Sequence, residues 1–367
     1  MKCYIVLLIL LYLILIMNCY DKQNVEHFST YSGCNKIPTL LKKVMDEQNI
    51  KKNQEDYDYY IPCSYNSCEK DALMFENKEG KKIYLIDGCD WLASKLGLWE
   101  LLKEYYNNDA TLYMPPTYLL ENNKDLKNFP SHFIENKNKR PDQMYVLKNY
   151  EQRQEGIKLT RDLDEIIKGR KNGWYLVQDY LYEPYQIDRR KINLRYYLLV
   201  ICRNGNIEGY IHTDGFVYYT PKYYDEYDMD FDKHITTGYI DRKVYEKNPL
   251  TLQDFRNFLN NEQIDLSKKW DKNAEILMSK VMEAISKKIC KNTKLKNNIR
   301  FQLFGCDLAP DVNLNVKLIE INKGPDLSAK DERDKQVKFD VQKDIFKLVD
   351  LNGENDIINT TKFIKIY

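Results

Sequence analysis

The stretch Phe301–Leu327, FQLFGCDLAPDVNLNVKLIEINKGPDL, decides the fold, because it predicts the strand pair around which the rest of the chain is organised. Two runs rich in apolar and β-branched residues, 301–308 and 315–321, flank a polar break that contains Pro310. This pattern is typical of two antiparallel strands joined by a short loop.

Oxygen-bearing side chains gather at one end of this predicted pair. Because side chains alternate between the faces of a strand, Glu320 and Asn322 are expected on one face. Ile319 and Ile321 then lie on the opposite face. Asp307, near the end of the first strand, can lie beside Glu320, and such a cluster favours a magnesium ion, whose remaining ligands are often phosphates. The alternative is that Asp307 and Glu320 are solvated ends of ordinary strands.

Composition indicates a globular protein. The 367 residues are enough for one large or two medium domains, and 43% of them are hydrophobic and 30% charged. The net charge of +1 argues against a partner such as nucleic acid, which binds strongly basic surfaces.

The cysteines and histidines do not form a recognisable metal motif. The nine cysteines are scattered, and the close pair Cys63 and Cys68 has no second pair to complete a zinc site. We expect most of them to be buried thiols, and a Cys63–Cys68 disulfide would require an oxidising compartment. The four histidines show no ligand spacing, which argues against a histidine metal site or a Ser-His-Asp triad.

The first part of the chain contains fifteen uninterrupted apolar residues, Cys3 to Met17, behind a single positive charge. This run predicts a signal peptide or an uncleaved membrane anchor over residues 1–20. We favour the anchor, because no pair of small residues marks a cleavage site. Protein attached in this way would be membrane-associated.

The remaining sequence predicts one large folded domain, residues 81–351, between a polar tether or edge segment, 21–80, and a tail, 352–367. Alternating and helical apolar patterns place strands and helices within the domain. Strands are expected at 83–88, 144–150, 174–181 and 192–202 and in the meander that follows, and helices at 39–48, 89–106, 249–293 and 334–351.

Basic residues lie where they could surround a nucleotide. Lys148 lies near the end of one predicted strand, and Lys191, Asn193 and Arg195 share a face of another. Together with a metal site, such cations can neutralise the charge of a transferring phosphoryl group. The chain has neither a P-loop motif nor the motifs of protein kinases, so the site would be of another class. The alternative is that these charges lie on solvated strand edges.

Two segments resemble signatures of the tubulin–tyrosine ligase-like family. QDYLYEPYQIDRRKINLRYYLLV, residues 178–200, is similar to the family's Q-K-Y-I … R-K-F-D-I-R, and the opening stretch is similar to its F-E-L-L-G-x-D … L-L-E-V-N-x-x-P. The weaker matches MPPTYLL, LASKLGLWE, YVLKNYEQRQEGI and HITTGYI occur in the family's order, so that the resemblance covers about 82–350.

The resemblance implies an α/β (α+β) ATP-grasp fold, with an N-terminal α/β domain, a central domain and a C-terminal antiparallel sheet flanked by helices. It implies a ligase that uses ATP and Mg²⁺ to phosphorylate a protein carboxylate, on tubulin or another protein, and to join it to a free amino acid. It also favours a catalytic domain on the cytosolic side of the membrane.

The resemblance assigns roles by motif position. It implies catalytic residues at Lys191, Arg195 and Lys95, nucleotide-binding residues at Lys148, Gly156, Gln178, Asp179, Tyr180, Leu181 and Lys191, and metal ligands at Asp307, Glu320 and Asn322.

The chain departs from the family pattern at several of these motifs. Asn193 replaces the family's aspartate, Thr237 its asparagine and Tyr218 a basic residue, so that no charge remains at the first or the last of these positions. Three interpretations follow: an active ligase, a degenerate relative that binds a nucleotide or a partner with little catalysis, or an anchored structural protein with the same fold.

Overall fold

The computed structural model describes residues 29–34, 37–62, 80–149, 156–203, 205–236, 240–291, 298–350 and 360–367. The apolar run from Cys3 to Met17, the pair Cys63 and Cys68, and Thr237 all lie outside these ranges. Within them, no helix has both the length and the apolar character needed to cross a membrane.

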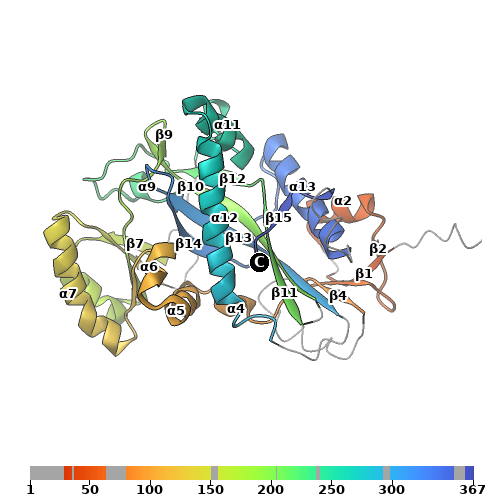
Figure 1. The fold of residues 1–367 in the computed structure, drawn as a ribbon, viewed down its shortest axis with the longest axis horizontal. Coiled ribbons are helices and arrows are strands. Elements are labelled where there is room, and N and C mark those ends of the chain that lie inside the picture. Colours follow the sequence, from red (N-terminus) through yellow and green to blue (C-terminus); the bar gives the residue numbers. More distant parts are fainter. Residues whose placement is uncertain are drawn as a thin grey trace, which may run out of the picture.

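A large mixed sheet forms the body of the described chain (Figure 1). Its strands follow the order β15-β11-β10-β13-β4-β3-β1-β2, with β9 and β12 also paired to β10, and β14 to β13. The bounds are β1 Thr30–Gly33, β2 Lys51–Lys52, β3 Tyr59–Ile61, β4 Lys82–Ile83, β9 Gln186–Ile187, β10 Arg190–Arg203, β11 Asn206–His212, β12 Phe216–Tyr219, β13 Ile299–Pro310, β14 Val316–Asn322 and β15 Phe363–Lys365. The predicted strand pair is therefore present as β13 and β14, and it is antiparallel.

Helices cover both faces of the central strand β10. Tyr196 accepts a hydrogen bond of 2.8 Å from the indole of Trp270 in α12, on one face. The next residue, Tyr197, points the other way and packs edge-on against Phe216, over which Lys338 of α13 lies. The helices around this sheet are α2 Thr39–Glu47, α9 Phe231–His234, α10 Val244–Lys247, α11 Leu252–Glu262, α12 Leu266–Ile285 and α13 Glu332–Asp350. Because both faces are covered, β10 is buried along most of its length.

A smaller antiparallel sheet forms a separate layer near helix α7 (Figure 1). Its order is β5-β8-β6-β7, with bounds β5 Thr117–Leu119, β6 Tyr145–Lys148, β7 Ile157–Thr160 and β8 Leu176–Asp179. Phe129 and Phe133 of α7 pack against Tyr145 of β6 and give this layer a core of its own. The associated helices are α7 Asn123–Lys139 and α8 Leu163–Ile167, followed by a 3-10 turn at Gly169–Asn172.

The helix expected over 89–106 is in fact two helices, α4 Cys89–Leu92 and α5 Lys95–Tyr106. Ser94 separates them, because its side chain accepts a hydrogen bond from the backbone N–H of Gly97 and so caps the start of α5. The chain then passes through a 3-10 turn at Asn107–Asp109 and the short helix α6 Ala110–Tyr113. As a result, Lys95 lies in the first turn of a helix instead of its middle.

The segment expected to be a polar tether or edge segment contributes strands to the edge of the large sheet. Strand β1 pairs in parallel with β3, and β3 pairs in parallel with β4. Tyr59 of β3 is fully buried and packs edge-on against Phe346 of α13. These pairings are long-range, so the local sequence pattern does not reveal them.

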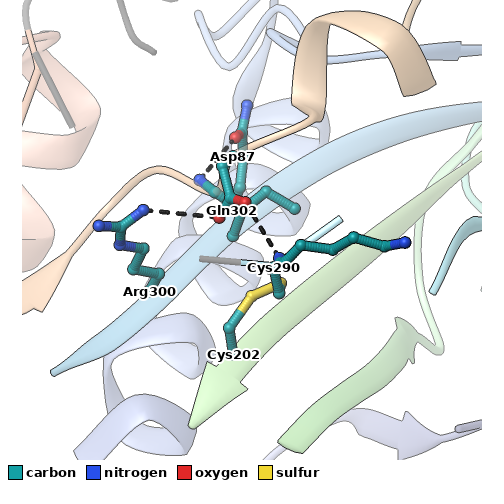
Figure 2. Close-up of a disulfide and its surroundings, with 7 residues drawn as sticks. Asp87, Cys202, Cys290, Arg300 and Gln302 are labelled. Carbon is teal, nitrogen blue, oxygen red and sulfur yellow. Dashed lines mark hydrogen bonds and ion pairs between the residues drawn. A yellow bond between two sulfur atoms is a disulfide. The ribbon is translucent and has the colours of Figure 1, made fainter. Parts of the chain in front are cut away.

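Two cysteines expected to be thiols, Cys202 and Cys290, instead form a disulfide (Figure 2). Cys202 lies near the end of β10, and Cys290 follows α12. The covalent bond therefore joins two elements that are 88 residues apart in the sequence. Cys306, in contrast, is a buried thiol.

Candidate functional site

Strands β13 and β14 bring the three predicted metal ligands together. Asp307 is the direct partner of Glu320 in the antiparallel register, and Gly305 is the partner of Asn322. The side-chain amide of Asn322 donates a hydrogen bond of 3.0 Å to Glu320 Oε1. The two carboxylates and the amide therefore lie within one small region, as the alternation of side chains predicts.

A β-bulge at Ile319 changes one part of this expectation. The register passes from the pair Asp307 and Glu320 directly to Leu308 and Leu318, so Ile319 is the extra residue. Ile319 and Glu320 both line the cavities beside the strands, although strict alternation would put them on opposite faces. Bulges redirect side chains in this way near many active sites.

Asp307 is held by Arg195 of β10. The guanidinium donates to both carboxylate oxygens, from Nε at 2.6 Å and from Nη2 at 3.0 Å. Burial raises the pKa of Asp307 to about 6 even though Arg195 acts to lower it, and the charge of Glu320 adds to the rise. Burial also acts to raise the pKa of Glu320, but Lys148 and Asn322 bring it below the ordinary value.

This donor set fits a magnesium ion. It offers two carboxylates and an amide, all hard oxygen donors, beside a cavity with room for further oxygen ligands. Asp307 and Glu320 face each other in the strand register, and Glu320 adds to the rise that burial causes in the pKa of Asp307, so a divalent cation would relieve the charge of this pair. Asp307, Glu320 and Asn322 are therefore the residues that would hold the metal.

Lys148 and Lys191 lie in the same cavity with almost no exposure to solvent. Lys148 donates a hydrogen bond of 2.8 Å to the side chain of Gln178. Burial lowers the pKa of Lys148 to about 8, an effect that Lys95 adds to and Glu320 opposes. Burial together with the nearby charge of Lys148 lowers the pKa of Lys191 to about 7. Two buried amines with depressed pKa values form a site that an anion would stabilise.

A buried hydrogen-bond chain behind Lys191 was missed by sequence reasoning. Lys191 Nζ donates to the hydroxyl of Tyr180 at 3.2 Å, and that hydroxyl donates to His234 Nδ1 at 2.9 Å. His234 Nε2 donates in turn to the backbone oxygen of Asp228 at 2.7 Å, which fixes the imidazole tautomer. The HITTGYI match begins at His234 and was the available signal, but only the structure shows its contact with Tyr180.

The segment from Gln178 to Leu181, predicted to bind adenine, lines this cavity. The side chain of Gln178 also donates to Thr117 at 2.9 Å, so both ends of its amide are engaged. Asp179 turns its carboxylate away to accept a hydrogen bond of 2.9 Å from His132 Nε2. Gly156, whose backbone oxygen accepts from Asn149 N at 3.1 Å, does not line the cavities described here.

Lys95 lies across a second cavity, which it shares with Lys148, Glu320 and Asn322. Its amine donates a hydrogen bond of 3.0 Å to the backbone oxygen of Asn149, the residue that follows β6. This hydrogen bond links α5 to the end of β6. Lys95 thus lies near the predicted metal ligands Glu320 and Asn322.

Asn193 and Tyr218, the substituted positions within the described residues, lie near the predicted metal ligands, and Asn193 lines the cavity that also contains Lys148 and Lys191. Asn193 Nδ2 donates to Thr236 at 3.1 Å, whereas its Oδ1 is buried without a hydrogen-bond partner in the described chain. Tyr218 lies under the guanidinium of Arg195, whose carbon is 5.3 Å from the ring centre. An amide and a phenol thus lie beside the side chains of the candidate site.

A third cavity lies beside Arg195 and Tyr218. Its charged lining residues include Arg195, Asp326, Lys330 and Lys338. All three cavities share Glu320, so one carboxylate faces a lysine-rich cavity, the Lys95 side and this open, charged cavity. The geometry can place a nucleotide, a metal ion and a further substrate around a single point.

The two sheets with a lysine-rich cavity beside paired carboxylates are consistent with the ATP-grasp class of folds. The sequence profile of the tubulin-tyrosine ligase family matches residues 74–357. The chain therefore belongs to the tubulin-tyrosine ligase family.

Curated relatives agree with this assignment. The chain is 27% identical to tubulin glycylase 3B of Drosophila melanogaster, over 56% of this chain and 29% of that protein. It is 26% identical to a probable beta-tubulin polyglutamylase of Tetrahymena thermophila, over 70% of this chain and 23% of that protein. It is 25% identical to the probable tubulin polyglutamylase ttll-9 of Caenorhabditis elegans, over 67% of this chain and 61% of that protein. The matched regions span less than two thirds of each of these relatives.

Proposed function

We propose that this chain is an ATP-dependent carboxylate–amine ligase. It would join a free amino acid to a carboxylate of a protein acceptor, tubulin or another protein, through an acyl phosphate. The observation that supports this most is the meeting of three cavities at Glu320, because the reaction requires a nucleotide, a metal ion and an acceptor at one point.

The buried lysines would bind the phosphates of ATP. Lys148 and Lys191 would bind phosphate oxygens, and Lys95 would reach the terminal phosphate from α5. Gln178 to Leu181, at the end of β8, would hold the adenine. Each buried amine gains an anionic partner when ATP binds, and this compensates for its desolvation.

Strands β13 and β14 would supply the ligands of the metal ion at the reacting phosphate. Asp307, Glu320 and Asn322 would hold Mg²⁺, which when bound neutralises charge on the phosphate oxygens. Arg195 uses Nε and Nη2 to hold Asp307, and its Nη1 would be directed to the phosphoryl group or the acyl phosphate. The amine of the incoming amino acid would then displace phosphate from the acyl phosphate and form the amide bond.

A second candidate is a family member that binds ATP with little turnover. It is favoured by the neutral Asn193 and Tyr218, because an amide and a phenol cannot supply the charges found at these positions in the family. In this case ATP would bind in the same cavity without ligation.

Release of ADP distinguishes these candidates. We expect the full chain to release ADP from ATP and Mg²⁺ in the presence of amino acids and an acceptor, and Glu320→Gln to lose this activity with its fold retained. The matched control is Glu332→Gln, which changes an exposed carboxylate of α13. Turnover that survives in Glu320→Gln would refute the metal assignment, and magnesium-dependent ATP binding without turnover in the wild type would favour the second candidate.

We further propose that the apolar run from Cys3 to Met17 attaches the protein to a membrane. Recovery of the full chain in a carbonate-washed membrane fraction, and its release when this run is deleted, would support attachment. Recovery of the full chain in the supernatant would contradict it.

A further inference from the structure

A disulfide joins Cys202 of β10 to Cys290, which follows α12. The two Cα atoms are 6.0 Å apart, within the range usual for disulfides. Cys202 is 2% exposed and Cys290 is half-buried, so the bond lies within the packed structure. Its two halves are 88 residues apart, which means that oxidation closes a long loop of the unfolded chain.

The segment around Cys290 is also tied to the loop that precedes α4 (Figure 2). Asp87 accepts from the backbone N–H of Cys290 at 3.4 Å, and its carboxylate accepts from the backbone N–H of Lys291 at 3.0 Å. Arg300 of β13, fully buried, lies 3.5 Å from the same carboxylate. The disulfide thus joins β10, which carries Lys191 and Arg195, to the segment after α12, and hydrogen bonds join that segment to the loop before α4.

A second position shows the same chemistry. Cys34, which follows β1 and is 6% exposed, is also disulfide-bonded. Disulfides persist in secreted proteins and in oxidising compartments, and they are rare in the cytosol, where they are mostly transient. The buried cross-link at Cys202 and the separate disulfide of Cys34 are therefore evidence of where the domain folds. The apolar run from Cys3 to Met17 is consistent with entry into that route.

We propose that Cys202–Cys290 is a permanent structural disulfide, formed while the domain folds in an oxidising compartment, and that the active site faces that compartment instead of the cytosol. This reverses the orientation expected from the family resemblance. If the proposed ligase activity holds, the acceptor is a protein exposed in the same compartment.

The oxidation is a thiol–disulfide exchange. The two thiols lose two protons and two electrons and form one S–S bond, and the disulfide of a thiol oxidoreductase takes up the electrons and protons to become a dithiol. Once formed, the bond is half-buried and remains oxidised for the life of the protein.

Differential thiol labelling in the native cells tests the redox state. Cells expressing the full chain are quenched in acid, free thiols are blocked with N-ethylmaleimide under denaturing conditions, and the disulfides are then reduced and labelled with the heavy reagent. We expect heavy label at Cys202 and Cys290 and light label at the buried thiol Cys306, which serves as the internal control. Light label at Cys202 and Cys290, or heavy label that appears only under oxidative stress, would overturn the proposal.

Two further measurements test the orientation of the domain and the structural role of the disulfide without an assay of ligase activity. In closed membrane vesicles we expect the domain to resist added protease until detergent is present, and digestion without detergent would overturn the assigned orientation. We also expect dithiothreitol to lower the melting temperature of the purified protein by about 5 °C, and to have a smaller effect on the double variant Cys202→Ser, Cys290→Ser. An equal effect on both proteins would overturn the structural role. No readout depends on ligase activity, so the ligase proposal can fail independently.

Discussion

Replacement of Lys191 by methionine should weaken ATP binding and stabilise the protein without ligand. Lys191 is 7% exposed, and burial lowers its pKa to about 7. A charged amine that binds a phosphate contributes about 1.5–3 kcal/mol, so ATP should bind roughly 10- to 150-fold more weakly to Lys191→Met. Without ATP, the buried amine costs on the order of a few kcal/mol at neutral pH, and the methionine removes this cost.

The pH dependence of both effects follows from the direction of the pKa shift. The unfolded chain binds the proton of Lys191 up to about pH 10.5, whereas the folded protein releases it near pH 7. The stability gained by Lys191→Met should therefore be largest below pH 7 and disappear as the pH approaches 10.5. The difference in ATP affinity from the wild type should be greater at pH 6 than at pH 8.

Isothermal titration with ATP and thermal unfolding measure the two effects in one set of proteins. The matched control is Lys268→Met, which changes an exposed lysine of α12 and should alter neither quantity. The opposite signs of the two changes distinguish loss of a ligand contact from general misfolding. Unchanged ATP affinity, or a lower melting temperature without ATP, would refute the assignment of Lys191 to the phosphates.

Two other substitutions test the hydrogen-bond and ion-pair geometry. Tyr180→Phe removes the hydroxyl between Lys191 and His234. In an ADP-release assay, the KM for ATP should therefore rise about 5- to 20-fold with little change in kcat. An unchanged KM would show that the hydroxyl does not position the amine of Lys191. Lys338→Met leaves its buried partner Asp334, 2.9 Å away, without a counter-charge and should lower the free energy of unfolding by about 3–5 kcal/mol in urea titrations. Adding Asp334→Asn should recover part of that loss, and no recovery would contradict the role of the pair.

The placement of side chains in the candidate site was predictable from the sequence where local rules apply. Alternation of side chains and the polar break were enough to bring Asp307 opposite Glu320, because the loop between the strands is short. The ordered motifs extended this to Lys148 and Lys191, both of which line the cavity beside that pair.

Features that depend on distant pairings were not predictable. The bulge at Ile319 is a shift in the pairing of β14 with β13, and the apolar pattern of β14 alone does not reveal it. The contact between Arg195 and Asp307 requires the register of β10 on β13, and Cys202 and Cys290 become neighbours only after β10 and α12 are packed. The strands β1 to β3 are two to four residues long, too short for a period of two to be recognised.

The short strand β15 has a practical consequence for work on this protein. It hydrogen-bonds along β11 through Phe363 to Lys365, and the backbone of Tyr367 continues the contact at Gly209. Without these residues, β11 would present a row of unpaired amide and carbonyl groups to solvent, an arrangement that promotes self-association between molecules. A variant that ends at residue 359 should therefore form dimers or precipitate. An affinity tag placed after Tyr367 needs a flexible spacer, so that β15 stays paired with β11.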